Sequence, residues 1–250
     1  MQVSGNSYYL LNIPDNYYPN KTYRDAFEWY RGDSAQKIVD GEKSDHGGVR
    51  PYYGLEPIDN NSAAIFLVPD GLNAGWVNHN GEEVTIFEQL VKTIEFDLRI
   101  NANLHFSTDF SNGGAMSYSL VCARTDMIRP VAIIYGAELS GCSGRTQPVA
   151  YCSQHGTNDS VLDVAMCCYT RDKFVASNDY TKLASEPQPN GGISVQAVYS
   201  GCTQRFLSTW HSSTMGSHIQ LQADYPPKLV ISSKAVWQVP EIFSCLDHPL

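Results

Sequence analysis

Hydrophobic residues along the chain fall into short runs that end at turn residues. Ala63–Val68 is continuously apolar and stops at Pro69-Asp70-Gly71, and Pro130–Tyr135 stops in the same way at Gly136. Runs of this kind predict strands that are buried on both faces, as in a parallel sheet. Branched and aromatic residues predict further strands at Tyr8–Ile13, Arg24–Tyr30, Val149–His155, Ser194–Tyr199 and Phe206–His211.

Helical periodicity separates these strands. In Val84–Ile100 an apolar stripe runs from Ile86 to Leu98, and Thr85 with Glu88 predicts a capping box at the start of the helix. Further helices are expected within Ser34–Val49, from Ser111 to about Arg124, over Val164–Ala176 and around Ser233–Leu246, where Pro240 should kink or split the last one.

Alternating strands and helices define the expected fold class. They predict an α/β protein with a mostly parallel central sheet and helices on both faces. No internal repeat appears, and no change in composition marks a linker, so residues 1–250 are expected to form a single domain.

One stretch, Leu104–Tyr118, combines both periodicities. Its alternating strand pattern stops at Ser111, and helix-periodic residues resume beyond Gly113 and Gly114. A serine at the corner between strand and helix is the layout of a nucleophile elbow, in which the hydroxyl projects above the sheet. Asp109 departs from that motif, because glycine is usual two residues before the serine. The alternative is a strand–helix junction whose serine and glycines only make the turn.

Three predicted strands are followed by a serine, an aspartate and a histidine, in that order along the chain. Ser111, Asp159 and His218 occur in the sequence order of an α/β-hydrolase triad. Histidine can activate a serine hydroxyl near neutral pH, and a carboxylate fixes the tautomer of that histidine. Asp159 has the alternative role of a turn residue, and His211 and His155 are alternatives for the base. The other histidines are expected to be bystanders on loops, strand surfaces or the C-terminal tail: His46, His79, His105 and His248.

An oxyanion hole needs two backbone N–H groups. One is expected from Asn112, directly after the serine, and the other from the loop after an early strand, near Trp29 or Tyr30. No phosphate-binding loop or dinucleotide motif is present, and no cofactor is predicted. A zinc site at Cys152 and His155 with the adjacent Cys167 and Cys168 is disfavoured, because neighbouring cysteines rarely bind one ion.

Composition narrows the function classes. A net charge of −9 and a pI near 5.1 argue against nucleic acids and anionic membranes as partners. No apolar run approaches the roughly 18 residues of a membrane span, and no signal peptide is predicted. Seven cysteines leave at least one without an intramolecular partner. Low charge and sequons at Asn20, Asn60 and Asn158 indicate a secreted protein.

Several motifs also match a known family. They are Tyr9–Tyr17, Tyr52–Leu55, Asn73–Trp76, Gly81–Val84, Phe110–Tyr118, Leu139–Gly144 and His155–Leu162. Over nearly its whole length the chain resembles the secreted fungal feruloyl esterases of the carbohydrate esterase class, which are related to polyhydroxybutyrate-depolymerase-like esterases. The resemblance implies an α/β-hydrolase fold and hydrolysis of esters that join ferulic or related hydroxycinnamic acids to plant cell-wall sugars. It also implies Ser111, Asp159 and His218 as the triad.

Aromatic residues near the matched motifs are expected to contact the phenolic acid or the sugar. Tyr52, Tyr53 and Trp76 are the predicted contacts, with ordinary packing as the alternative for each.

Several residues depart from the family pattern and bear on whether the predicted esterase is active. Asp109 replaces glycine and Glu28 replaces histidine, and both add carboxylates that would oppose negative charge on the oxyanion. Family cysteines are replaced at Arg99 and Tyr180, so Cys142 and Cys202 are expected to lack their usual partners, and residues 215–218 read Met-Gly-Ser-His instead of Asp-Gly-Gly-His. The alternatives are a catalytically degenerate esterase fold that binds wall polysaccharide or an aromatic ester, and an esterase for acetylated xylan or aliphatic polyester.

Overall fold

The computed structural model describes residues 9–29, 35–40, 43–44, 47–48, 52, 64–71, 75–142, 147–188, 195–199 and 208–213. The strands are β1 (Tyr9–Asn12), β2 (Tyr23–Glu28), β3 (Lys43–Ser44), β4 (Gly47–Gly48), β5 (Ala64–Pro69), β6 (Ile100–Phe110), β7 (Ile128–Ile134), β8 (Ala150–Gly156), β9 (Val195–Tyr199) and β10 (Ser208–Ser213). The helices are α1 (Gln36–Asp40), α2 (Glu82–Asp97), α3 (Asn112–Ala123) and α4 (Val164–Ser177). The C-terminal helix predicted from the sequence lies outside the described residues.

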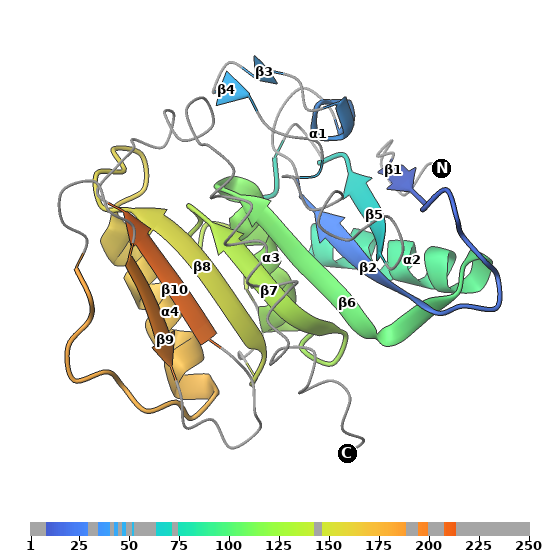
Figure 1. Ribbon diagram of the computed structural model, residues 1–250. Coiled ribbons are helices and arrows are strands. Elements are labelled where there is room, and N and C mark those ends of the chain that lie inside the picture. Colours follow the sequence, from blue (N-terminus) through green and yellow to red (C-terminus); the bar gives the residue numbers. More distant parts are fainter. Residues whose placement is uncertain are drawn as a thin grey trace.

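A large sheet organises these elements, with strand order β1-β5-β2-β6-β7-β8-β10-β9, as Figure 1 shows. The pairs from β5 through β10 are parallel, whereas β1 and β9 add antiparallel edges. The predicted α/β class with a mostly parallel sheet is therefore confirmed.

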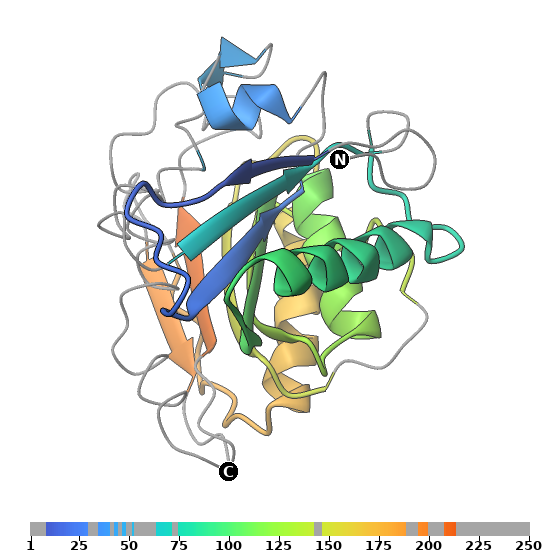
Figure 2. The ribbon, with the colours of Figure 1, turned by 90° about the vertical axis from the view of Figure 1, so that its right-hand side faces the viewer.

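The three long helices α2, α3 and α4 lie against one face of the sheet (Figure 2). In the chain, α2 lies between β5 and β6, α3 between β6 and β7, and α4 between β8 and β10, so all three connections run in the same direction across the sheet. Because crossovers between parallel strands are right-handed, connections in one direction place their helices on the same face. Within the described part of the chain, no helix is both long enough and apolar enough to cross a membrane.

Helix α2 buries the apolar stripe that the sequence predicts. Ile86, Leu90 and Ile94 are each at most 2% exposed and pack into the main core. The predicted start of the helix is wrong, because α2 begins at Glu82 after Gly81, whose φ of 78° is left-handed. Thr85 donates its hydroxyl hydrogen to the carbonyl of Gly81 instead of forming a capping box.

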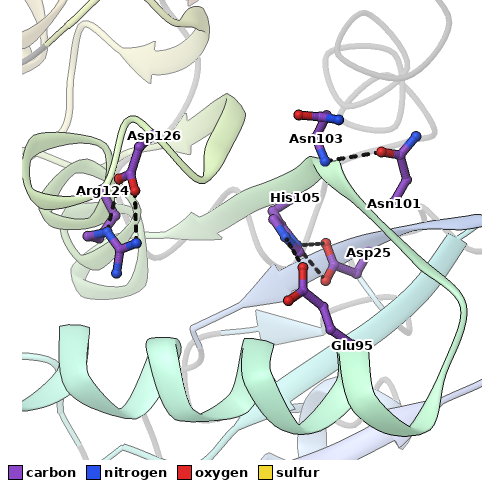
Figure 3. Close-up of polar contacts among 7 residues, drawn as sticks. All are labelled: Asp25, Glu95, Asn101, Asn103, His105, Arg124 and Asp126. Carbon is purple, nitrogen blue, oxygen red and sulfur yellow. Dashed lines mark hydrogen bonds and ion pairs between the residues drawn. The ribbon is translucent and has the colours of Figure 1, made fainter.

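The expectation that His105 lies on the surface of its strand is also wrong. His105 is 1% exposed, because both faces of β6 are covered at this level. Its Nδ1 lies 2.8 Å from each carboxylate oxygen of Asp25 on β2, and its Nε2 lies 3.3 Å from Oε1 of Glu95 on α2 (Figure 3). This ionic cluster of the buried Asp25 and His105 with the exposed Glu95 ties α2 to two central strands.

The cluster makes stability depend on pH. Burial lowers the pKa of His105, but the hydrogen bond and charge of Asp25, together with Glu95, outweigh it and raise the pKa above the ordinary 6.5. A group whose pKa rises on folding stabilises the fold fully below its unfolded pKa, and that contribution is lost as the pH rises through the folded pKa. We therefore expect the stability advantage of the wild type over His105→Gln to be largest near pH 6, and to shrink by at most about 1.4 kcal/mol per pH unit above that.

Urea denaturation between pH 6 and pH 9 measures this advantage. His79 is exposed, so His79→Gln is the matched control and should follow the pH dependence of the wild type. An advantage over His105→Gln that grows with pH would contradict the assignment of a charged His105 in the folded state.

Candidate active site

Ser111 occupies a strained corner between β6 and α3. Its φ of 55° and ψ of −117° lie outside the regions that residues other than glycine usually adopt. Its N–H donates to the carbonyl of Ile134 at 2.8 Å, and its carbonyl accepts from the N–H of Ala115 at 3.0 Å. The surrounding strands and helix thus hold the backbone strain that a nucleophile elbow requires.

Gly113 permits the close approach that forms this corner. A Cβ added there would lie 2.0 Å from the carbonyl oxygen of Trp29 and 2.5 Å from Cγ of Asp109. The first turn of α3 therefore passes directly over the ends of β2 and β6.

The carboxyl group of Asp109 is buried beside the first turn of α3. Asp109 is 1% exposed, accepts the N–H of Phe110 at 2.5 Å, and packs its Cγ against Gly113. Helix N-termini favour negative charge, because their free N–H groups carry partial positive charge. The carboxyl group that replaces the glycine of the family pattern is therefore buried at the N-terminus of α3.

Two loops meet the elbow on the side where the oxyanion hole is predicted. The carbonyl of Trp29 faces Gly113, and the indole N–H of Trp29 donates to Oγ of Ser107 at 2.9 Å. Oδ1 of Asn112 accepts the N–H of Trp76 at 2.9 Å. Trp29 and Asn112 are thus brought together at the start of α3. Glu28 is 0% exposed at the end of β2, and Tyr30 lies outside the described residues.

The predicted aromatic substrate contacts that the structure describes are packed inside the protein. Trp76 is 0% exposed and meets Trp29 edge to face, with ring centroids 5.0 Å apart. Tyr52 is 4% exposed and packs against Phe66. Packing is the role that the structure gives these two rings, and their contact with a substrate stays a prediction. Tyr53 lies outside the described residues.

Asp159 lies in a tight turn beyond β8. Its Oδ1 accepts the N–H groups of Val161 at 2.8 Å and Leu162 at 2.9 Å, and its Oδ2 lies 3.3 Å from Nε2 of His155. The side chain is fully shielded from solvent. The sequence predicts a turn residue or a triad acid at this position, and the turn itself is present.

The strand register places Ser111 and Asp159 at the same edge of the sheet. Phe110 of β6 pairs with Ile134 of β7, and Ile134 pairs with Gln154 of β8. Parallel strands are spaced about 4.8 Å apart, so β6 and β8, which lead to Ser111 and Asp159, lie about 10 Å apart across the sheet. The edge is the carboxyl end of the strands, where α/β proteins carry their functional groups.

The predicted base, His218, lies outside the described residues. Strand β10 ends five residues before it in the chain, at Ser213, which pairs with Gly156 at the end of β8. β10 therefore ends beside β8, the strand that precedes Asp159 in the chain. His211, the alternative base, is a residue of β10 itself and pairs with Gln154.

A disulfide bond joins the C-terminal end of α3 to the segment after β7. Cys142 is bonded to Cys122 of α3, with Cα atoms 5.8 Å apart, a pairing that the sequence did not predict. Next to the bond, Gly141 donates its N–H to the carbonyl of Val77 at 2.9 Å, and Asn78 donates to the carbonyl of Gly141 at 2.7 Å. These contacts connect the disulfide to the segment that directly follows Trp76. Within the described residues, no cluster of three His, Cys, Asp or Glu side chains is placed to hold a metal ion.

Comparison with solved structures identifies the fold. The protein is similar to the acetyl xylan esterase from Aspergillus awamori, with a TM-score of 0.60 and 12% identity over 85% of this chain and 89% of that one. It is also similar to a protein described as FAE, with a TM-score of 0.61 and 13% identity over 97% of this chain and 85% of that one. The sheet, the elbow and these neighbours define an α/β-hydrolase fold of the kind found in esterases.

Comparison with curated sequences narrows the assignment. The chain is 52% identical over 204 residues to feruloyl esterase D of Neurospora crassa, covering 81% of this chain and 70% of the relative. It is 38% identical over 205 residues to feruloyl esterase C of Emericella nidulans, covering 81% of this chain and 73% of the relative. No family model matches the chain. The chain belongs to the fungal feruloyl esterases, a group of carboxylic ester hydrolases, as its motifs predict.

Proposed function

We propose that the protein hydrolyses esters of ferulic or related hydroxycinnamic acids on plant cell-wall polysaccharides. The feruloyl esterases of Neurospora crassa and Emericella nidulans support the substrate class. The observation that carries the mechanism is the strained backbone of Ser111 at the corner between β6 and α3. That conformation stores strain at one serine, which is the arrangement of a nucleophile held clear of the sheet.

The proposed reaction is acyl transfer in two steps. Oγ of Ser111 attacks the ester carbonyl while His218 takes its proton, and His218 returns the proton to the departing sugar hydroxyl. Water, activated by His218, then cleaves the acyl-enzyme and releases the hydroxycinnamic acid. Asp159 orients His218 and stabilises its charged form. No cofactor enters either step.

Backbone N–H groups stabilise the oxyanion in this proposal. Asn112 supplies one from the first residue of α3, and the segment at Trp29 and Tyr30 supplies the other. The close approach of Trp29 to Gly113 supports this placement, because it brings the loop after β2 to the corner that carries Ser111. Aromatic contacts to the phenolic acid are assigned to Tyr52, Tyr53 and Trp76.

We also infer that the protein acts outside the cell as a single esterase domain. The disulfide between Cys122 and Cys142 supports this location, because disulfides persist mainly in oxidising compartments. A polysaccharide substrate is itself extracellular.

Hydrolysis of methyl ferulate, compared with p-nitrophenyl acetate, tests the proposed function. We expect turnover of methyl ferulate that is absent in Ser111→Ala. Turnover of the acetate alone would favour an acetyl xylan or aliphatic ester esterase. Binding of ferulate esters without turnover of either substrate would overturn the proposal in favour of a catalytically inactive binding protein.

A further inference from the structure

We propose that His155 positions the acid of the triad. This inference rests on the proposed function, in which Asp159 is that acid. His155 is the penultimate residue of β8 and is 0% exposed. Its contacts join both ends of the turn that carries Asp159 and connect this turn to the strand end beside Ser111.

The turn beyond β8 is held by hydrogen bonds to the Asp159 carboxylate and to Nε2 of His155. Oδ1 of Asp159 holds the turn by accepting the N–H groups of Val161 and Leu162. The carbonyl oxygen of Leu162 points back and lies 2.9 Å from Nε2 of His155. The same Nε2 lies 3.3 Å from Oδ2 of Asp159. We assign this oxygen as the hydrogen-bond partner of the base, His218.

This geometry fixes the tautomer of His155. A carbonyl oxygen only accepts hydrogen bonds, so Nε2 must carry the hydrogen that faces Leu162. That N–H also lies beside Oδ2 of Asp159. One imidazole N–H thus restrains the far end of the turn and the acid together.

The ring of His155 is itself held in place by the strand that neighbours the elbow. It stacks on Tyr135, with ring centroids 5.0 Å apart and an angle of 21° between the planes. Tyr135 directly follows β7 and donates its N–H to the carbonyl of Gln154 at 2.8 Å, whereas the preceding Ile134 accepts the N–H of Ser111. A continuous set of contacts therefore runs from the nucleophile through Tyr135 and His155 to the acid.

These contacts distinguish His155 from a base. Its Nε2 donates to Leu162, and its ring is covered by Tyr135, so it acts through Asp159. Displacement of a reacting group by about 1 Å costs up to about 100-fold in rate. Loss of the His155 contacts should therefore lower kcat and leave substrate binding nearly unchanged.

Kinetics of His155→Leu and His155→Gln on methyl ferulate test the inference. The leucine lacks a donor, and we expect kcat to fall by about 10- to 100-fold with little change in KM. The amide of glutamine can donate from nearly the position of Nε2, so His155→Gln should recover most of that loss. His155→Asn, whose amide is too short to reach Leu162, should stay below His155→Gln.

The pH profile separates positioning from simple loss of stability. A well-placed carboxylate raises the pKa of the base by stabilising its charged form. The acidic limb of kcat/KM should therefore move to lower pH in His155→Leu and stay in place in His155→Gln. Wild-type kcat and an unshifted profile in His155→Leu would overturn the inference.

Asp159→Asn distinguishes failure of the inference from failure of the proposed function. Should Asp159→Asn keep the wild-type kcat, Asp159 is not the acid, and both the triad and the role of His155 fall. Loss of activity in Asp159→Asn, with wild-type kinetics in His155→Leu, would remove only the role of His155. If His155→Leu does not fold, equal kcat values for His155→Gln and His155→Asn would be the contradicting result.

Discussion

Replacing Ser111 with alanine should lower kcat on methyl ferulate by about 10⁵- to 10⁶-fold, with little change in KM. In the proposed mechanism the hydroxyl oxygen forms the acyl-enzyme, and its removal leaves only the oxyanion hole and substrate binding to assist attack by water. The backbone strain at Ser111 is maintained by bonds to Ile134 and Ala115, which involve main-chain atoms only. The alanine variant should therefore keep the fold while it loses the reaction.

Steady-state hydrolysis measures this loss, and mass spectrometry after treatment with an organophosphate locates the nucleophile. One adduct is expected on Ser111 of the wild type and none on Ser111→Ala. Ser185, exposed in the segment after α4, gives the matched control Ser185→Ala, which should react and turn over like the wild type. A Ser111→Ala variant that kept kcat within about tenfold of the wild type would exclude the triad mechanism.

Replacing Gly113 with alanine should lower the free energy of unfolding by more than about 3 kcal/mol or prevent folding. The added Cβ would lie 2.0 Å from the carbonyl oxygen of Trp29, and backbone of this kind cannot move aside cheaply. Trp29 is anchored through its indole to Ser107, and the same Cβ would also lie 2.5 Å from Cγ of the buried Asp109. Relief would require α3 to move away from the sheet.

Chemical denaturation compares this variant with Gly75→Ala. At Gly75 the nearest atom to an added Cβ is Oδ1 of Asn112 at 4.0 Å, so this control should change stability by less than about 1 kcal/mol. Equal stability of the two variants would show that α3 does not pack on the elbow as described.

Elements with a strong local pattern were predictable from the sequence. The stripe from Ile86 to Ile94 identifies α2, because burial of one helix face follows directly from residue spacing. The corner at Ser111 was predictable for the same reason, since strand and helix periodicities meet there. The start of α2 was not, because the left-handed Gly81 supplies a turn that a search for capping side chains does not detect.

Features that depend on contacts between distant residues were not predictable. Asp25 and His105 are 80 residues apart in the chain. Leu104, Phe106 and Thr108 alternate along one face of β6, and this pattern does not indicate that α2 covers the other face, where His105 lies. The pairing of Cys142 with Cys122 likewise depends on how α3 lies beside the loop after β7. The positions of Ser111 and Asp159 after their strands did predict that both lie at one edge of the sheet, because parallel strands end at the same edge. The base at His218 stays a prediction.

The strand order also sets a sequence of assembly. β6, β7 and β8 are consecutive in the chain and adjacent in the sheet, so they join through short connections, whereas β10 begins only at Ser208. Longer connections cost more entropy to close and form more slowly. During synthesis, the strands that carry Ser111 and Asp159 can pair before β10 has left the ribosome. If the proposed triad is correct, we expect the nascent chain to contain Ser111 and Asp159 but to hydrolyse no ester until this late strand docks beside β8.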